Sequence, residues 1–151
     1  MWTKTIKDIN MSRPLKYDYI ENDPTRKFAD INISFTKHPI TGDVSIKTDD
    51  DAIKQGLRNL VLLNYNEKPF HYEIGGDIYN ILFDNIEDPG NEESVRYVLS
   101  ALINQYEPRV ELQGIDVDFL LDKNAMEISI YYIILNTLQP SNVTIFLKNV
   151  R

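Results

Sequence analysis

The chain has 151 residues and no cysteine, and its 16 Lys and Arg against 23 Asp and Glu give a net charge of -7. This length fits one domain, and the lack of cysteine excludes disulfides, thiolate metal sites and cysteine nucleophiles. The acidic balance argues against a basic nucleic-acid face and against an anionic membrane partner, and no apolar run approaches the roughly 20 residues that span a bilayer.

Residues 1–27 differ from the rest of the chain, because they mix proline and basic residues with many apolar side chains and show no sustained period. This composition predicts an extended N-terminal arm that lies on the surface of the domain or of a partner. A short amphipathic helix over residues 3–11, followed by coil, is the alternative that the pattern leaves open. A single domain is predicted over residues 28–151. The polar start lacks the apolar core of a secretory signal, which predicts a cytosolic protein.

A hairpin and a helix are expected first in the domain. Apolar and polar residues alternate on both sides of the turn-forming stretch 38–43, which predicts a β-hairpin over Phe28–Lys47 with one solvated face. A helix is expected from Thr48, whose hydroxyl can cap its free amides, with the carboxylates of Asp49–Asp51 at its positive end. This acidic triplet is not expected to bind a metal ion, since consecutive helical carboxylates diverge. The apolar stripe of the helix consists of Ile53, Leu57, Leu60 and Val61.

Two further helices are predicted. Gly75 and Gly76 precede a short helical run with Ile78, Ile81 and Leu82. The glycine pair is interpreted as a structural turn, because no strand clearly leads into it and no phosphate-loop motif follows. The strongest helical period, over residues 95–106, ends before Pro108, whose ring cannot continue a helix.

The last third of the chain returns to a period of two. Three strands are expected between residues 110 and 148, with a bulge at Gln113-Gly114 and turns at 122–124 and 139–142. Residues 131–135 are apolar on both faces, which predicts a central strand or one covered on both sides. Because strands and helices are segregated, the predicted class is α+β: a mainly antiparallel sheet, from the N-terminal hairpin and a C-terminal three-strand meander, packed with two to three helices.

Catalytic chemistry is weakly indicated. His38 and His71 are far apart in sequence and no serine stands in a nucleophile-elbow context, so neither a serine hydrolase nor a histidine metal centre is expected, and no cofactor is predicted. A glycosidase needs two carboxyl groups about 5–10 Å apart, and Glu107 with Asp116 or Asp118 is the candidate pair.

The segment Glu107-Pro108-Arg109 is distinctive, because proline holds an acid and a guanidinium at a predicted helix-to-strand corner. A nearby guanidinium favours the ionised form of a carboxyl group, which argues against Glu107 as a general acid. Arg109 could form a two-bond fork with a partner's carboxylate or meet the carbonyl groups at a partner's helix end. An intramolecular pair between Glu107 and Arg109 that closes the corner is the other interpretation, and the residues alone leave both open.

Three segments of the chain carry a resemblance to a known family. Residues 51–60, residues 66–83 and Glu107-Pro108-Arg109 resemble the small baseplate wedge protein of contractile-tailed phages, the sheath initiator, which is related to a type VI secretion baseplate component and often labelled lysozyme-like. The third segment is the most specific, since it matches the family's Glu-Pro-Arg signature. The resemblance covers residues 28–148. It departs at residues 70–73, where relatives often have Arg, Pro and Asp, and the arm is not a family hallmark.

The resemblance implies a structural role without enzymatic activity in the virion tail baseplate, assembled in the host cytoplasm with six copies per baseplate. Glu107, Pro108 and Arg109 are the partner-binding residues that it implies, and they would grip the helical core bundle of larger wedge proteins. The central tube or hub is a further candidate partner, whereas nucleic acid, membrane, metal and cofactor are not expected.

The implied fold is similar to the handshake domain of sheath subunits, so the first ring of the contractile tail sheath would dock by adding strands to this sheet. An open sheet edge can accept a strand through main-chain hydrogen bonds. The hairpin at 28–47 and the final strand Val143–Lys148 are both candidate edges. A peptidoglycan-cleaving, lysozyme-like glycosidase is the alternative function.

Overall fold

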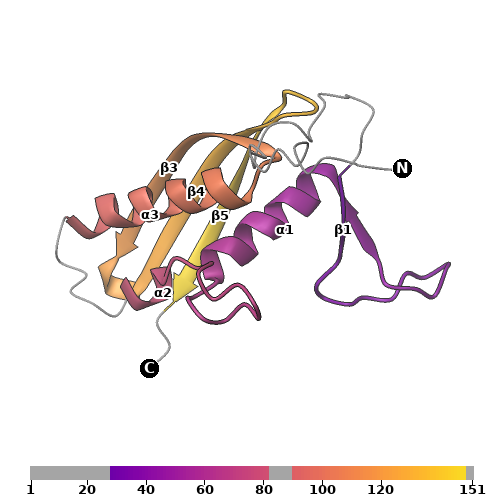
Figure 1. Cartoon of the computed structure of the whole chain (residues 1–151), viewed down its shortest axis with the longest axis horizontal. Helices are drawn as coiled ribbons and strands as arrows, with labels where there is room; N and C mark the ends of the chain where they lie inside the picture. The colour runs from indigo at the N-terminus through magenta and orange to yellow at the C-terminus, as the bar shows by residue number, and fades with distance from the viewer. Residues whose placement is uncertain (1–27, 82–89, 149–151) are drawn as a thin grey trace, which may run out of the picture.

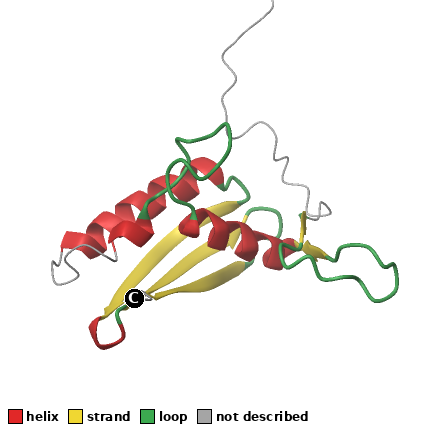
Figure 2. Ribbon diagram, turned by 90° about the horizontal axis from the view of Figure 1, so that it is seen from below, coloured by secondary structure: helices red, strands yellow, loops and turns green. Residues whose placement is uncertain are grey.

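The computed structural model describes residues 28–81 and 90–148, so the predicted arm, Leu82 and residues 149–151 lie outside the described part. The element order is β1 (Ala29–Ile31), β2 (Ile46–Thr48), α1 (Asp49–Leu62), α2 (Ile78–Ile81), α3 (Gly90–Tyr106), β3 (Val110–Leu120), a short 3-10 helix (Leu121–Lys123), β4 (Ala125–Ile134) and β5 (Pro140–Lys148). A three-stranded antiparallel sheet, β3-β4-β5, carries α1 and α3 on one face (Figures 1 and 2). The α+β prediction is confirmed.

The C-terminal meander follows the predicted pattern closely. β4 is the central strand, and the register of β3 against β4 shifts between Leu112 and Gly114, which confirms the bulge. The predicted turn at 139–142 is wrong, since β5 already begins at Pro140. The reversal lies earlier, where the Leu138 amide donates to the Ile134 carbonyl at 2.8 Å. Proline fits the start of β5 because this strand is at the sheet edge.

The hairpin is shorter than predicted and forms a separate two-stranded sheet beside α1. β2 runs directly into α1, which keeps the hairpin at the N-terminal end of that helix (Figure 1). Its apolar row does not enter the core: the exposed fractions are 63% for Ile31 and 71% for Phe35. The hairpin therefore presents apolar side chains outward.

The core lies between the two long helices and the inner face of the sheet. Period-matched side chains of α1 and α3 meet the inward rows of β3, β4 and β5, as both patterns predict. The residues that form it include Ile53, Leu57, Val61, Val95, Leu99, Ile103, Val117, Met126, Ile128, Ile130, Tyr132, Ile134, Val143, Ile145 and Leu147. The outer face of β4 stays partly exposed at Tyr131, so this strand is central but covered on one side.

The start of α1 and the turn at Gly75 were both predicted from the sequence. Thr48 occupies the N-cap position of α1 but makes no side-chain cap; instead the Asp49 amide donates to the Phe28 carbonyl at 2.7 Å. A Cβ on Gly75 would stand 2.5 Å from the carbonyl carbon of Asn64, which supports the structural interpretation of this glycine. None of the helices in the described ranges is long and apolar enough to cross a membrane.

Candidate interaction site at the helix-to-strand corner

The corner between α3 and β3 is closed by a two-bond fork. The Nε atom of Arg109 donates to Oε1 of Glu107 at 2.6 Å, and Nη2 donates to Oε2 at 2.8 Å. Glu107 is only 6% exposed, so the fork supplies the hydrogen bonds that a buried carboxylate requires. This geometry is the intramolecular pair that the sequence left open.

Arg109 also reaches the hairpin. Its Nη1 atom donates to Oδ2 of Asp30 at 2.9 Å, and the guanidinium carbon lies 5.7 Å from the ring centroid of Phe28. The hydrogen bond with Glu107 raises the pKa of Arg109, although burial acts against this, and Asp30 raises it further. The guanidinium therefore stays charged and joins the corner to the hairpin.

Gly56 in α1 makes room for this arrangement. A Cβ at this position would stand 2.8 Å from Nη2 of Arg109 and 3.0 Å from Oε2 of Glu107. The fork thus lies directly on the helix at the one point where the helix has no side chain. Sequence reasoning did not identify this role, although a glycine inside a strong helical pattern was the available signal.

Gln55, the preceding residue of α1, holds the hairpin by a second contact. Its Nε2 atom donates to the Ile31 carbonyl at 2.8 Å, and its Oε1 atom accepts from the Ile33 amide at 3.3 Å. A side-chain amide thereby pairs with the backbone as a neighbouring strand would. Gln55 and Arg109 together fix where the hairpin lies.

Asp50 ties the start of α1 to the main sheet. Its Oδ1 atom accepts from the Tyr132 hydroxyl at 2.9 Å and the Ser141 hydroxyl at 2.8 Å, and Lys54 pairs with Oδ2 at 2.6 Å. Burial acts to raise the pKa of Asp50, but the hydrogen bonds from Lys54, Ser141 and Tyr132 outweigh it and the net shift is downward. Burial raises the pKa of the Tyr132 phenol. One member of the acidic triplet is thus a structural anchor.

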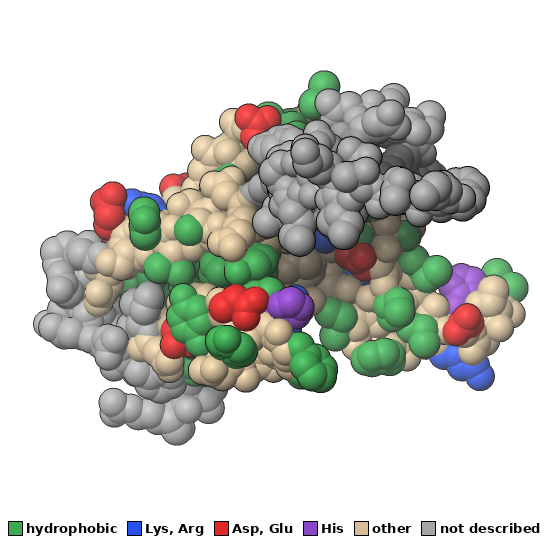
Figure 3. Space-filling view, viewed as in Figure 1, with side chains coloured by type: hydrophobic (Ala, Val, Ile, Leu, Met, Phe, Trp, Pro, Cys, Tyr) green, Lys and Arg blue, Asp and Glu red, His purple; other side chains and the backbone are tan. Residues whose placement is uncertain are grey.

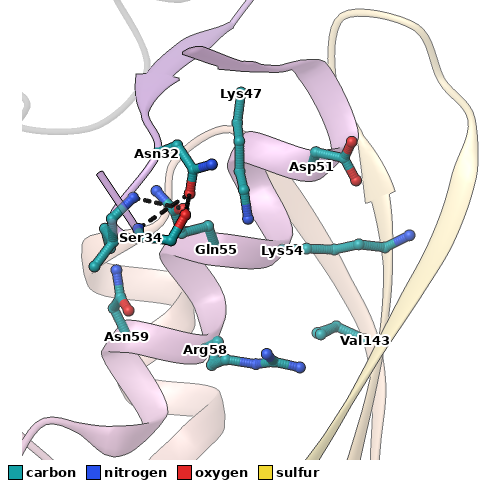
Figure 4. A pocket seen from close by; sticks show the side chains of 10 residues that line it. Asn32, Ser34, Lys47, Asp51, Lys54, Gln55, Arg58, Asn59 and Val143 are labelled. Carbon is teal, nitrogen blue, oxygen red and sulfur yellow. Dashed lines mark hydrogen bonds between the residues drawn. The ribbon is translucent and has the colours of Figure 1, made fainter. Parts of the chain in front are cut away.

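The β5 edge is the most regular open edge of the main sheet. Its nine residues pair with β4 without a register shift, and no other strand of the described chain pairs with its outer side. A groove of about 480 Å³ lies between this edge, the hairpin and α1 (Figure 4). The residues that line it are Asn32, Ile33, Ser34, Lys47, Asp51, Lys54, Gln55, Arg58, Asn59 and Val143.

Hydrophobic side chains are also exposed outside the sheet. Figure 3 shows them over the hairpin, where Ile31, Ile33, Phe35 and Ile46 contribute. A second group lies in the loop between α1 and α2, where Phe70 is 97% exposed and has a positive φ of 66°. Exposed apolar patches of this kind are typical of protein-binding surfaces.

The candidate glycosidase pair is not brought together. Glu107 is buried at the start of the corner, whereas Asp116 and Asp118 are exposed on the outer side of β3. Six residue steps along β3 from Val110 to Asp116 span about 20 Å, so the strand carries Asp116 and Asp118 away from the corner.

The histidines stand apart from this corner. The His38 ring accepts amides of its own turn, and His71 pairs with Glu73 at the surface. No group of three or more possible metal ligands occurs in the part of the chain that the structure describes.

Solved structures share this fold, and two of them are the following. A protein from Geobacter sulfurreducens, provisionally described as a tail lysozyme, is similar over 66% of this chain and 89% of its own, with a TM-score of 0.58 and 17% sequence identity. A chain of the anti-feeding prophage baseplate, in a sixfold-symmetrised cryo-electron microscopy structure, matches 82% of this chain and 88% of its own, with a TM-score of 0.56 and 19% identity. No protein-family model and no curated protein sequence matches the chain. At these identities the likeness shows a common fold.

Proposed function

We propose that this protein is a structural component of a contractile-tail baseplate. The observation that carries the proposal is the fold shared with a chain of the anti-feeding prophage baseplate over most of both chains. The Glu-Pro-Arg corner, which resembles the signature of the wedge family, and the exposed apolar side chains of the hairpin add support from the chain itself. In this role the protein binds other baseplate components in the virion tail.

The corner is the proposed contact with the helical core bundle of larger wedge proteins. Arg109 keeps 19% of its side chain exposed while its fork with Glu107 holds the guanidinium in one orientation. Such preorganisation lowers the entropic cost of binding. Pro108 and the exposed rim of Arg109 would face the bundle, with Glu107 as the internal support.

The β5 edge is the proposed attachment point for a strand of the first sheath ring. The β3 edge is interrupted by its bulge, and β1 and β2 have only three residues each, whereas β5 offers nine residues in regular register. Bulges and short strands are poor templates for a further strand. The length and regular register of β5 favour Val143–Lys148 over the hairpin as the docking edge.

Reconstitution with the wedge and sheath proteins of a contractile tail tests the proposal. Arg109→Lys is expected to weaken wedge assembly, because a point ammonium lacks the fork. Sheath docking is expected to slow the hydrogen exchange of β5 amides while β3 amides are unchanged. Normal assembly by the folded Arg109→Lys variant would exclude the corner as the contact, and unprotected β5 amides in the sheath-bound state would exclude the edge.

The same proposal holds that the protein does not cleave peptidoglycan. Its support is the fork, which occupies both carboxylate oxygens of Glu107, and the outward placement of Asp116 and Asp118. A turbidity assay on purified protein and on Glu107→Gln tests this. Lysis that depends on Glu107 would favour the glycosidase alternative instead.

A further inference from the structure

The groove beside β5 has the opposite charge to the rest of the molecule. The chain carries a net charge of -7, yet the groove is lined by the three cations Lys47, Lys54 and Arg58 and by one acid, Asp51. Lys54 is paired with Asp50, whereas no ion pair among the described residues involves Lys47 or Arg58. Within residues 28–81 and 90–148, these two cations therefore have no carboxylate partner.

These cations are aligned with the open edge. Lys54 and Arg58 are one helical turn apart on α1, and Figure 4 shows both side chains extending towards β5, where Val143 forms the opposite wall. Lys47 enters the same groove from the hairpin. A strand laid along the outer side of β5 would pass in front of this row.

We infer that the segment that occupies the β5 edge is an extended polypeptide of another chain with carboxylate side chains at alternate positions facing the groove. The inference rests on the proposed strand addition and names the chemistry of its partner. Alternate side chains of an added strand share one face, so two carboxylates at i and i+2 can reach successive cations. Arg58 can receive a carboxylate as a two-bond fork.

A polypeptide fits this groove better than a polyphosphate. Asp51 stands among the cations, and the net charge of the whole chain repels nucleic acid. The open backbone of β5 offers amide and carbonyl groups that a peptide satisfies in register and a nucleic acid does not.

Three fluorescent nine-residue peptides test the inference with the full-length chain. They share an alternating valine frame and carry Glu, Lys or Ser at the other positions. Fluorescence anisotropy is expected to show the Glu peptide binding at least about tenfold more tightly than the Lys peptide at low salt, with a smaller ratio at high salt. Amide resonances of Val143 and Ile145 are expected to shift on binding.

Charge-reversal variants assign the effect to the groove. Arg58→Glu and Lys47→Glu are each expected to weaken the Glu peptide about fivefold, the size of one exposed ion pair, while leaving the fold intact by circular dichroism. Lys123→Glu, in the exposed 3-10 turn beyond β3, is the matched control and is expected to have no effect.

The outcomes separate this inference from the proposed function. Equal binding of all three peptides at β5 would overturn the acidic partner and leave strand addition standing. If sheath protein protects the β5 amides but none of the three peptides binds, the acidic partner is likewise overturned and strand addition still stands. Tighter binding of a single-stranded oligonucleotide than of the Glu peptide would also overturn it. Sheath protein that leaves β5 unprotected would instead remove the proposed function at this edge.

Discussion

Arg109 and Asp30 form an ion pair at 2.9 Å although 79 positions separate them in the chain. The pair fastens the N-terminal hairpin to the corner where α3 gives way to β3. The same guanidinium holds Glu107, so one side chain sets both the shape of the corner and the place of the hairpin.

Asp30→Ala is expected to loosen the hairpin without unfolding the domain. The Asp30 side chain is 39% exposed, so its pair with Arg109 contributes less than about 1 kcal/mol to the free energy of unfolding. The amides of Asn32, which donates to the Ser45 carbonyl, and of Lys47 should exchange faster with solvent in NMR experiments, while amides of β4 exchange as before. Asp43→Ala, in the turn of the same hairpin, is the control. Unchanged exchange at Asn32 would show that the ion pair with Arg109 does not hold the hairpin in place.

Replacement of Arg109 is expected to destabilise the protein more than Asp30→Ala does, because Glu107 is buried. Arg109→Ala leaves an uncompensated buried carboxylate and should lower the free energy of unfolding by about 3–5 kcal/mol. Arg109→Lys keeps the charge but loses the two-bond fork. It is expected to lower the free energy of unfolding by about 1–3 kcal/mol. Urea denaturation at neutral pH measures both, with the exposed Arg58→Lys as a control. Equal stability of Arg109→Ala and the parent would contradict the role of the fork.

Gly56→Ala is expected to lower the free energy of unfolding, whereas the same change at an ordinary helical glycine raises it. In an open helix this change stabilises by about 0.4–1 kcal/mol. Here the new methyl group would push against the Arg109–Glu107 fork, and the fork cannot retreat without lengthening its hydrogen bonds. We expect a net loss of about 1 kcal/mol in thermal or urea unfolding. Gly114→Ala, where an added Cβ meets nothing within 4 Å, is the matched control. A stabilised Gly56→Ala protein would show that the fork yields easily.

Asp50 should make stability depend on pH at the acidic end. The pKa of Asp50 is lowered in the folded state. The ionised carboxylate therefore stabilises the fold above the ordinary pKa of 3.8, and this stabilisation is lost as the pH falls through the pKa of the folded state. Between pH 5 and pH 2 the parent is therefore expected to lose more stability than Asp50→Asn. Urea unfolding at several pH values measures the difference. Tyr132→Phe removes one of the hydroxyl donors to Asp50, so its loss of stability should fall between those of the parent and of Asp50→Asn. Identical pH profiles for the parent and Asp50→Asn would show that Asp50 is not such an anchor.

The sequence predicted the elements whose patterns depend on burial. The helical period over residues 95–106 and the inward row from Met126 to Ile134 are set by the hydrophobic effect, and both appear where expected. The bulge at Gln113-Gly114 was readable because a change of parity requires an extra residue.

Long-range polar contacts could not be predicted in the same way. Asp30 and Gly56 meet the corner, and Gln55 meets the hairpin, only after the chain has folded, and no local pattern marks these contacts. The alternation around Ile31 predicted a strand correctly but not that its apolar side chains would face outward, since a period of two does not identify which face is covered. The sequence identified the corner; the structure added the residues that hold it.

The corner also implies an order of folding. Glu107 and Arg109 are two positions apart, so closing their short loop costs little chain entropy and their contact can form early. The hairpin must close a loop of 79 positions before Asp30 arrives, which is a slower event for a non-local contact. We therefore expect the pair of Glu107 and Arg109 to form before Asp30 reaches the guanidinium, and the hairpin to dock last.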